Sequence, residues 1–285
     1  MRERKMKIGL IQVDGKLPNL ALMKLAKWHE QKGDNVTYID VSTHQFDITY
    51  ASKIFIGGSG YDLKSELPEG IEVLTPDYDK FKLDYSVGYT SRGCIRNCDF
   101  CIVREKEGFI HEVNYDWIKN AKVLLYDNNF LASPKWREKL QYFIEQKIKV
   151  CFNQGLDIRL INEENATMLS KVKYSDDQFK KRRLYFAFDD PKLELIVKEK
   201  VKLLIKHGIK PFHLLFYVLV GFNTTFEEDY KRFVILDELG CLPFIMIYNR
   251  KNDQTLRHFA RWVNKRYYKV CSWNEYRPNK RNKND

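Results

Sequence analysis

Residues 85–101 read Tyr-Ser-Val-Gly-Tyr-Thr-Ser-Arg-Gly-Cys-Ile-Arg-Asn-Cys-Asp-Phe-Cys, a strand-like segment that runs directly into three closely spaced cysteines. Cys94, Cys98 and Cys101 form the pattern C-x3-C-x2-C, with the aromatic residue Phe100 inside it. Three thiolates supply three corners of a cubane iron–sulfur cluster, whereas a closed zinc site or a fully protein-ligated cluster takes four ligands. The pattern therefore predicts a cluster with one iron open to another molecule.

A C-x3-C-x2-C pattern with an aromatic residue just before the third cysteine resembles the signature of the radical S-adenosylmethionine (radical SAM) superfamily. The resemblance implies that Cys94, Cys98 and Cys101 hold a [4Fe-4S] cluster and that the amino and carboxylate groups of SAM bind its open iron. One electron then cleaves SAM to methionine and a 5'-deoxyadenosyl radical, which abstracts hydrogen from a substrate. A reductase such as flavodoxin or ferredoxin is the implied electron donor.

A zinc site is the alternative interpretation of the three cysteines. Zinc would need a fourth ligand, and His111 is the nearest histidine after them. Zinc ligands more often come as two separated pairs than as one tight triplet, so the iron–sulfur interpretation is favoured. The other three cysteines stand singly and far apart, and we interpret them as structural or incidental thiols: Cys151, Cys241 and Cys271.

The composition fits a globular protein of 285 residues with 44% hydrophobic content. This length allows one barrel-sized domain and a smaller appendage. No stretch approaches the roughly 18 uninterrupted apolar residues of a membrane span, and the first residues lack a signal-peptide core. We therefore expect a cytoplasmic protein without a membrane partner, which suits thiols that must stay reduced.

Beyond the cysteines the sequence repeats an apolar run, a capped helix and a short break, which is the pattern of βα repetition. The expected strands are 85–89, 122–126, 149–153, 184–188, 213–220 and 244–248. We therefore predict an α/β fold with a six-stranded partial (β/α)6 TIM-like barrel over residues 81–250, the fold that the resemblance also implies. In such barrels the functional residues lie at the carboxyl ends of the strands.

Residues 1–80 are expected to form a separate, small Rossmann-like α/β domain. Strands are expected at 7–13, 36–41 and 53–56, and a helix at 19–31. This domain resembles the shortened amino-terminal domain of the radical SAM branch whose fuller members bind cobalamin. The cobalamin signature D-x-H-x-x-G is absent, so we predict no cobalamin. The glycines at 57–60 are a weak phosphate-loop signal.

Nine residues are candidates for binding SAM, and most follow the end of an expected strand: Phe100, Asp127, Asn128, Asn129, Asp157, Arg159, Asp189, Gly221 and Tyr248. The resemblance implies that the aromatic residue, the glycine and the backbone of the tyrosine lie near adenine. It also implies that residues 127–129 lie near the SAM amino group. The sequence assigns no catalytic residue.

Three of these candidates also carry an argument from chemistry. Asp157 and Arg159 stand two apart, so in an extended segment both side chains face the same side. An arginine in this place suits two-point binding of a carboxylate, either that of SAM or that of a substrate. Asp189 ends the fourth expected strand and is the candidate for the ribose hydroxyls.

The net charge of +11 is concentrated in the C-terminal extension, residues 251–285. From Arg250 to Asp285 the chain carries eleven Lys or Arg and three acidic residues, interleaved with six aromatic ones. This composition favours nucleic-acid binding, and it also fits a basic amphipathic helix whose aromatic residues are buried. An iron–sulfur protein that binds nucleic acid without SAM chemistry is therefore the alternative function.

Overall fold

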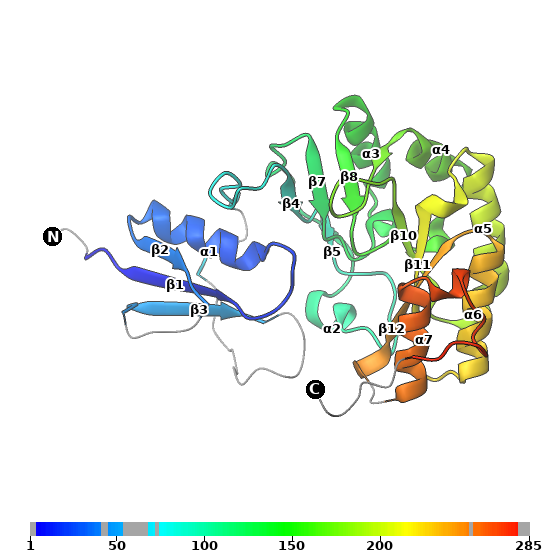
Figure 1. Ribbon diagram of the computed structural model, residues 1–285. Helices are drawn as coiled ribbons and strands as arrows, with labels where there is room; N and C mark the ends of the chain where they lie inside the picture. The colour runs from blue at the N-terminus through cyan, green and yellow to red at the C-terminus, as the bar shows by residue number, and fades with distance from the viewer. Residues whose placement is uncertain (1–3, 41–44, 54–67, 72–73, 251–252, 279–285) are drawn as a thin grey trace, which may run out of the picture. The chain divides into compact units, whose positions relative to one another are not determined.

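The computed structural model describes residues 4–40, 45–53, 68–71, 74–250 and 253–278 (Figure 1). The candidate phosphate loop at 57–60 lies outside these residues. The chain divides into two compact units, Met1–Tyr89 with Asn114–Val123, and Thr90–Val113 with Leu124–Asp285. The expected boundary at residue 80 thus falls inside the first unit, and the expected C-terminal extension is part of the second.

The first unit contains a three-stranded parallel sheet in the order β2-β1-β3, with one helix between the first two strands. Its elements are β1 (Lys7–Gln12), α1 (Leu20–Gln31), β2 (Asn35–Tyr38) and β3 (Ile48–Ser52), followed by β4 (Ser86–Gly88). Asn19 caps α1, because its side chain accepts a hydrogen bond from the Leu22 backbone N–H at 3.2 Å. The helix packs its apolar side against β1, where Ile8 and Leu10 are fully buried.

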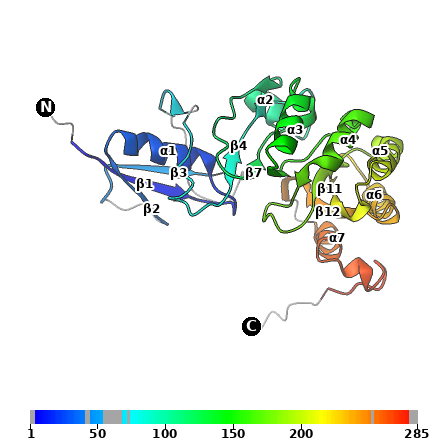
Figure 2. The same cartoon turned by 90° about the horizontal axis from the view of Figure 1, so that it is seen from above.

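The described part of the second unit contains the remaining helices and most of the strands (Figures 1 and 2). The helices are α2 (Val103–Glu107), α3 (Trp136–Glu145), α4 (Glu163–Lys171), α5 (Glu194–Lys206), α6 (Phe226–Glu238) and α7 (Gln254–Asn264). The strands are β5 (Ser91–Arg92), β6 (His111–Glu112), β7 (Lys122–Leu125), which begins in the first unit, β8 (Lys149–Phe152), β9 (Lys173–Tyr174), β10 (Leu184–Ala187), β11 (Leu214–Val220) and β12 (Leu242–Ile247).

The predicted six-stranded partial barrel is wrong. The described strands form several small sheets: a parallel one in the order β10-β11-β12, a four-stranded one in the order β4-β7-β8-β9, and an antiparallel pair of β5 and β6. The short strand β9 pairs with β8 through Lys149 with Lys173 and Val150 with Tyr174, so it takes the edge that the barrel would have given to β10. A single bridge, Leu156 to Phe186, links the two regions.

Local sequence signals position the helices that cover these strands. Thr225 and Glu228 form a reciprocal capping box at the start of α6, and Asn162 and Asn165 form another at the start of α4. Helix α6 packs against β11 and β12, and α7 packs against β12. Helices α4, α5 and α6 lie side by side (Figures 1 and 2).

Most aromatic residues of the C-terminal segment are used for packing, whereas Tyr267 has 38% of its surface exposed. Phe259 and Trp262 on α7 are buried, with 0% and 2% of their surface exposed. The ring centroid of Trp273 lies 5.6 Å from that of Phe226, and the centroid of Tyr268 lies 5.2 Å from that of Phe233. Phe226 and Phe233 belong to α6. The packing interpretation of this segment is therefore confirmed for residues 253–278. None of the helices within the described ranges is both long and apolar enough to cross a membrane.

Candidate functional site

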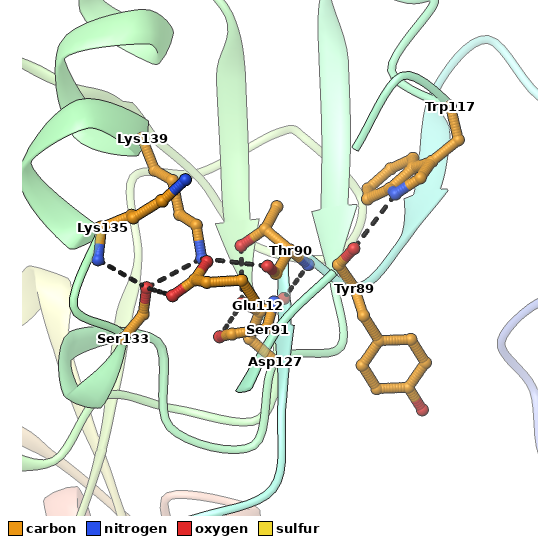
Figure 3. A network of polar contacts seen from close by, with 9 residues as sticks. All are labelled: Tyr89, Thr90, Ser91, Glu112, Trp117, Asp127, Ser133, Lys135 and Lys139. Carbon is orange, nitrogen blue, oxygen red and sulfur yellow. Dashed lines mark hydrogen bonds and ion pairs between the residues drawn. The ribbon is translucent and has the colours of Figure 1, made fainter. Parts of the chain in front are cut away.

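Asp127, just after β7, holds the start of the cysteine loop. Its carboxylate accepts hydrogen bonds from the backbone N–H groups of Thr90 and Ser91 at 2.7 and 2.8 Å (Figure 3). The hydroxyls of the same two residues donate to it at 2.6 and 2.7 Å. Burial raises the pKa of Asp127, and these hydrogen bonds oppose that rise. The side chain therefore fixes the backbone from which the cysteine loop begins.

A fully buried lysine supports this anchor from α3. The Lys139 ammonium lies 2.6 Å from the Glu112 carboxylate and donates to Ser133 Oγ at 2.9 Å and to the Thr90 carbonyl at 3.0 Å (Figure 3). Burial alone would raise the pKa of Glu112, but the contacts with Lys139 and Ser133 lower it overall. A buried charge is tolerated when it is paired and hydrogen-bonded in this way.

Glu107 of α2 holds the middle of the loop. Its carboxylate accepts from the Arg92 guanidinium at 3.0 Å, from the Gly93 backbone N–H at 3.2 Å and from the Asn128 amide at 2.6 Å. Gly93 has a φ of 77°, and a Cβ at this position would lie 2.2 Å from the Phe109 carbonyl oxygen. The residue before Cys94 must therefore be glycine, because both the backbone angle and the available space exclude a side chain.

All three cysteines line one cavity of about 630 Å³ within the second unit. Most of the rest of its wall comes from other residues of the cysteine loop and from residues at or just past the carboxyl ends of β7, β8, β10 and β11. Six of the nine predicted SAM-binding residues lie in this wall: Phe100, Asn128, Asn129, Asp157, Arg159 and Asp189. Carboxyl ends of neighbouring strands are where ligands bind in parallel α/β sheets, and the cavity is in such a place.

Asp157 joins the cysteine loop to the segment after β8. Its carboxylate accepts from Arg159 Nε at 2.6 Å and Nη2 at 3.0 Å, and from Arg96 Nε at 2.9 Å. Burial would raise the pKa of Asp157, but the two guanidinium groups lower it overall. Arg96 stands inside the cysteine motif, so this carboxylate holds two cations beside the thiols.

Asn129 is buried in the cavity wall and contacts both the cysteine loop and Asp157. Its Nδ2 lies 3.6 Å from the Cys94 sulfur and 3.5 Å from the Asp157 carboxylate. Its Oδ1 is buried and lacks a hydrogen-bond partner among the described residues. Burial raises the pKa of Cys98, and the positive charge of Arg159 opposes that rise. A ligand that donates a hydrogen bond would satisfy the Asn129 oxygen.

The far side of the cavity combines a carboxylate with aromatic rings. Asp189 accepts from the Leu219 backbone N–H at 3.0 Å, and burial raises the pKa of its carboxyl. The Phe100 ring lies 5.5 Å from that of Phe222, which in turn lies 4.6 Å from Tyr248. Tyr248 therefore packs against Phe222, a residue of the cavity wall, but does not itself line the cavity.

The cavity wall does not include Asp127, Gly221 or Tyr248. The first anchors the cysteine loop instead. The Gly221 backbone N–H donates to the buried Asp229 at 3.1 Å, and this glycine borders a second cavity of about 480 Å³. Sequence reasoning missed Arg96 and Phe222. The signal for Phe222 was its place directly after a strand end, and that for Arg96 was its place between two cysteines.

The donor atoms of this site are of the type that an iron–sulfur cluster takes. Among the described side chains, no group of three or more His, Cys, Asp or Glu is placed to hold a metal ion. Three thiols in one loop nevertheless face a single cavity that also contains an unsatisfied buried amide oxygen. Thiols are the ligands that such clusters take, so the chemistry of the donor set fits.

Comparison with known proteins assigns no family. No family model matches the chain, and no solved structure matches it. A protein of Rickettsia felis named as an ankyrin repeat protein is 27% identical over 135 residues. That match covers 46% of this chain and 35% of the relative, so the chain spans about a third of the relative's length.

Proposed function

We propose that this chain is a radical SAM enzyme in which Cys94, Cys98 and Cys101 hold one [4Fe-4S] cluster. The observation that carries the proposal is that the three thiols line one cavity together with six of the residues expected to bind SAM. A bound cluster would supply one electron for the reductive cleavage of SAM, which starts hydrogen abstraction from a substrate. The electron would come from a flavodoxin or a ferredoxin.

The cavity wall offers complementary groups for each part of SAM. Its volume of about 630 Å³ lies within the range of small-molecule sites, about 300–1,000 Å³. The unsatisfied Asn129 Oδ1 would accept a hydrogen bond from the amino group. Arg159 uses its Nε and one Nη for Asp157 and keeps further N–H donors for a carboxylate.

The other end of SAM would lie against the far wall. Asp189 has one carboxylate oxygen bound to the Leu219 N–H, and its second oxygen would accept from the ribose hydroxyls. Phe100 and Phe222 form an edge-to-face pair that would contact the adenine ring. In this assignment the protein binds and orients SAM, and the substrate would enter beside the adenosyl group.

Anaerobic reconstitution with iron and sulfide tests the proposal. We expect about four irons per chain and dithionite-dependent formation of 5'-deoxyadenosine from SAM. Cys98→Ala should lower the iron content and abolish product formation. Cys271→Ala is the matched control, because that thiol is also partly exposed but lies outside the cavity wall, and it should leave both unchanged. Full activity of Cys98→Ala, or zinc as the bound metal, would refute the proposal.

An iron–sulfur protein that binds nucleic acid without SAM chemistry is the second candidate. A group of basic residues at the amino ends of β10 and β11 favours it, because the charges of Arg182, Arg183 and Lys210 act on His213 and that of Arg266 acts on Arg183. The two candidates differ in one measurement. In the second, SAM would leave the spectrum of the reduced cluster unchanged, and Asp189→Asn would have no effect on it.

A further inference from the structure

Five basic side chains gather at the amino ends of β10 and β11, the strand ends opposite those that border the cavity. Arg183 directly precedes β10, and His213 directly precedes β11. The charges of Arg182 and Lys210 act on His213, and that of Arg266, after α7, acts on Arg183. We call these five residues the amino-end cluster.

Contacts with the protein hold three members of the amino-end cluster in place: Arg182, Arg183 and His213. Arg183 Nη1 donates to the Phe212 carbonyl at 2.8 Å. The Arg182 guanidinium lies 4.2 Å from the ring centroid of Tyr174, and the Tyr174 hydroxyl lies 2.9 Å from His213 Nδ1. These cations are therefore positioned before any ligand arrives, which reduces the entropy that binding would cost.

The positive charge of the amino-end cluster is only partly compensated. Within the described chain, Asp176 is the nearby carboxylate that acts on Arg183, and one of its oxygens already accepts backbone N–H groups of Lys180 and Lys181. Burial and then the Arg266 charge lower the pKa of Arg183, while burial and neighbouring cations lower that of His213. An anion bound here would relieve this repulsion.

An exposed aromatic ring lies among these charges. Phe212 has 54% of its surface exposed, and the Lys210 ammonium lies 5.7 Å from its ring centroid. The His213 ring stands edge-on to it at 4.8 Å. A phenyl ring beside guanidinium and ammonium groups offers a stacking platform next to phosphate-binding cations. A nucleic acid would use both features, because a base can stack on the exposed ring while its phosphates contact the cations.

We propose that the amino-end cluster binds single-stranded nucleic acid, with Arg182, Lys210 and Arg266 contacting phosphates and Phe212 stacking on a base. The proposal does not depend on iron–sulfur or SAM chemistry. It also moves the expected nucleic-acid surface, because two of the aromatic residues of the C-terminal segment that suggested it, Phe259 and Trp262, are buried. At the surface, this segment offers Arg266 and the neighbouring Tyr267, which has 38% of its surface exposed.

Fluorescence anisotropy with labelled single-stranded RNA and DNA 20-mers tests this proposal on the full chain. Arg182→Ala combined with Lys210→Ala should weaken binding at least about tenfold and reduce the slope of log K against log salt by about 1.4. Phe212→Ala should weaken binding about tenfold and leave that slope unchanged, because stacking is not an ionic contact.

The matched control is Lys106→Ala combined with Lys202→Ala, which removes two exposed charges on α2 and α5 that are not among those acting on Arg183 or His213. All mutated side chains are exposed, and circular dichroism should confirm that each variant is folded. Equal affinity of the cluster and control variants would overturn the proposal. Competition by polyglutamate as effective as that by polyuridylate would also overturn it, because the site would then bind any polyanion.

Discussion

Asp157→Asn removes the charge that holds two guanidinium groups beside the cysteine loop while keeping the shape of the side chain. One carboxylate oxygen accepts from the Arg159 backbone and Nε, and an asparagine oxygen can keep those bonds. The other carboxylate oxygen accepts from Arg96 Nε and Arg159 Nη2. In asparagine an NH2 group replaces this oxygen, and because it is itself a donor it cannot accept these two hydrogen bonds. At least two charge-assisted hydrogen bonds are therefore lost.

A hydrogen bond to a charged group contributes about 1.5–3 kcal/mol in a buried site. The Arg96 and Arg159 side chains are 34% and 32% exposed, so water replaces part of what the mutation removes. We expect the free energy of unfolding to fall by about 2 kcal/mol, which shifts a urea midpoint by about 1 M. Asp190→Asn is the control. The Asp190 side chain accepts one backbone hydrogen bond, from the Lys192 N–H, and an asparagine at a helix N-cap accepts such a bond equally well.

Urea unfolding of the metal-free protein, in the presence of a thiol reductant and a chelator, measures this difference. Three of the five tryptophans, Trp136, Trp262 and Trp273, belong to the second unit, so most of the tryptophan fluorescence reports on that unit. Because the pKa of Asp157 is lowered in the folded protein, its carboxylate stabilises the fold above the pKa of an unfolded aspartate, about 3.9. This stabilisation is lost as the pH falls towards the lower pKa of the folded protein. Equal midpoints for the two variants at pH 7 would refute this account of Asp157.

Three further substitutions test the base of the loop and the C-terminal segment. In thermal unfolding, Gly108→Ala should lower the stability by roughly 1 kcal/mol, and Gly93→Ala should lower it several times as much. Both glycines have a positive φ, but only at Gly93 would a Cβ lie against backbone atoms. Equal losses of stability for the two variants would contradict this. Lys139→Ala should cost about 3–5 kcal/mol because it leaves Glu112 without its cation, and a loss below 1 kcal/mol would show the pair to be dispensable. Trp262→Ala should cost about 3–5 kcal/mol by opening a cavity under α7, and unchanged stability would restore the solvent-facing interpretation.

The sequence predicted individual strands better than the sheets they form. Expected strands at 184–188 and 213–220 correspond to β10 (Leu184–Ala187) and β11 (Leu214–Val220), because long apolar runs mark buried parallel strands. These two strands pair in parallel, as the repeating pattern predicted, but the continuous six-stranded sheet that was expected to include them is wrong. Strand β9 has only two residues and no apolar run, yet it takes an edge of β8 and ends the regular series. A strand of two residues is too short to show a periodic pattern from which it could be predicted.

The candidate site was predictable where residues follow strand ends. Asp157 and Asp189 were found in this way, and both line the cavity with the cysteines. The role of Asp127 was not predictable, because its partners Thr90 and Ser91 lie 37 and 36 residues earlier in the chain. Tertiary pairing of this kind leaves no periodic signal. The same reason explains why Arg96 was missed, since its partner Asp157 is 61 residues away.

Electron paramagnetic resonance of the reduced, reconstituted protein tests most directly the claim that the cysteines and the strand-end residues form one site for a cluster and SAM. We expect SAM to change the spectrum of the wild-type protein and Asp189→Asn to require a higher SAM concentration for the same change. A [4Fe-4S] spectrum that saturating SAM leaves unaltered would contradict the claim.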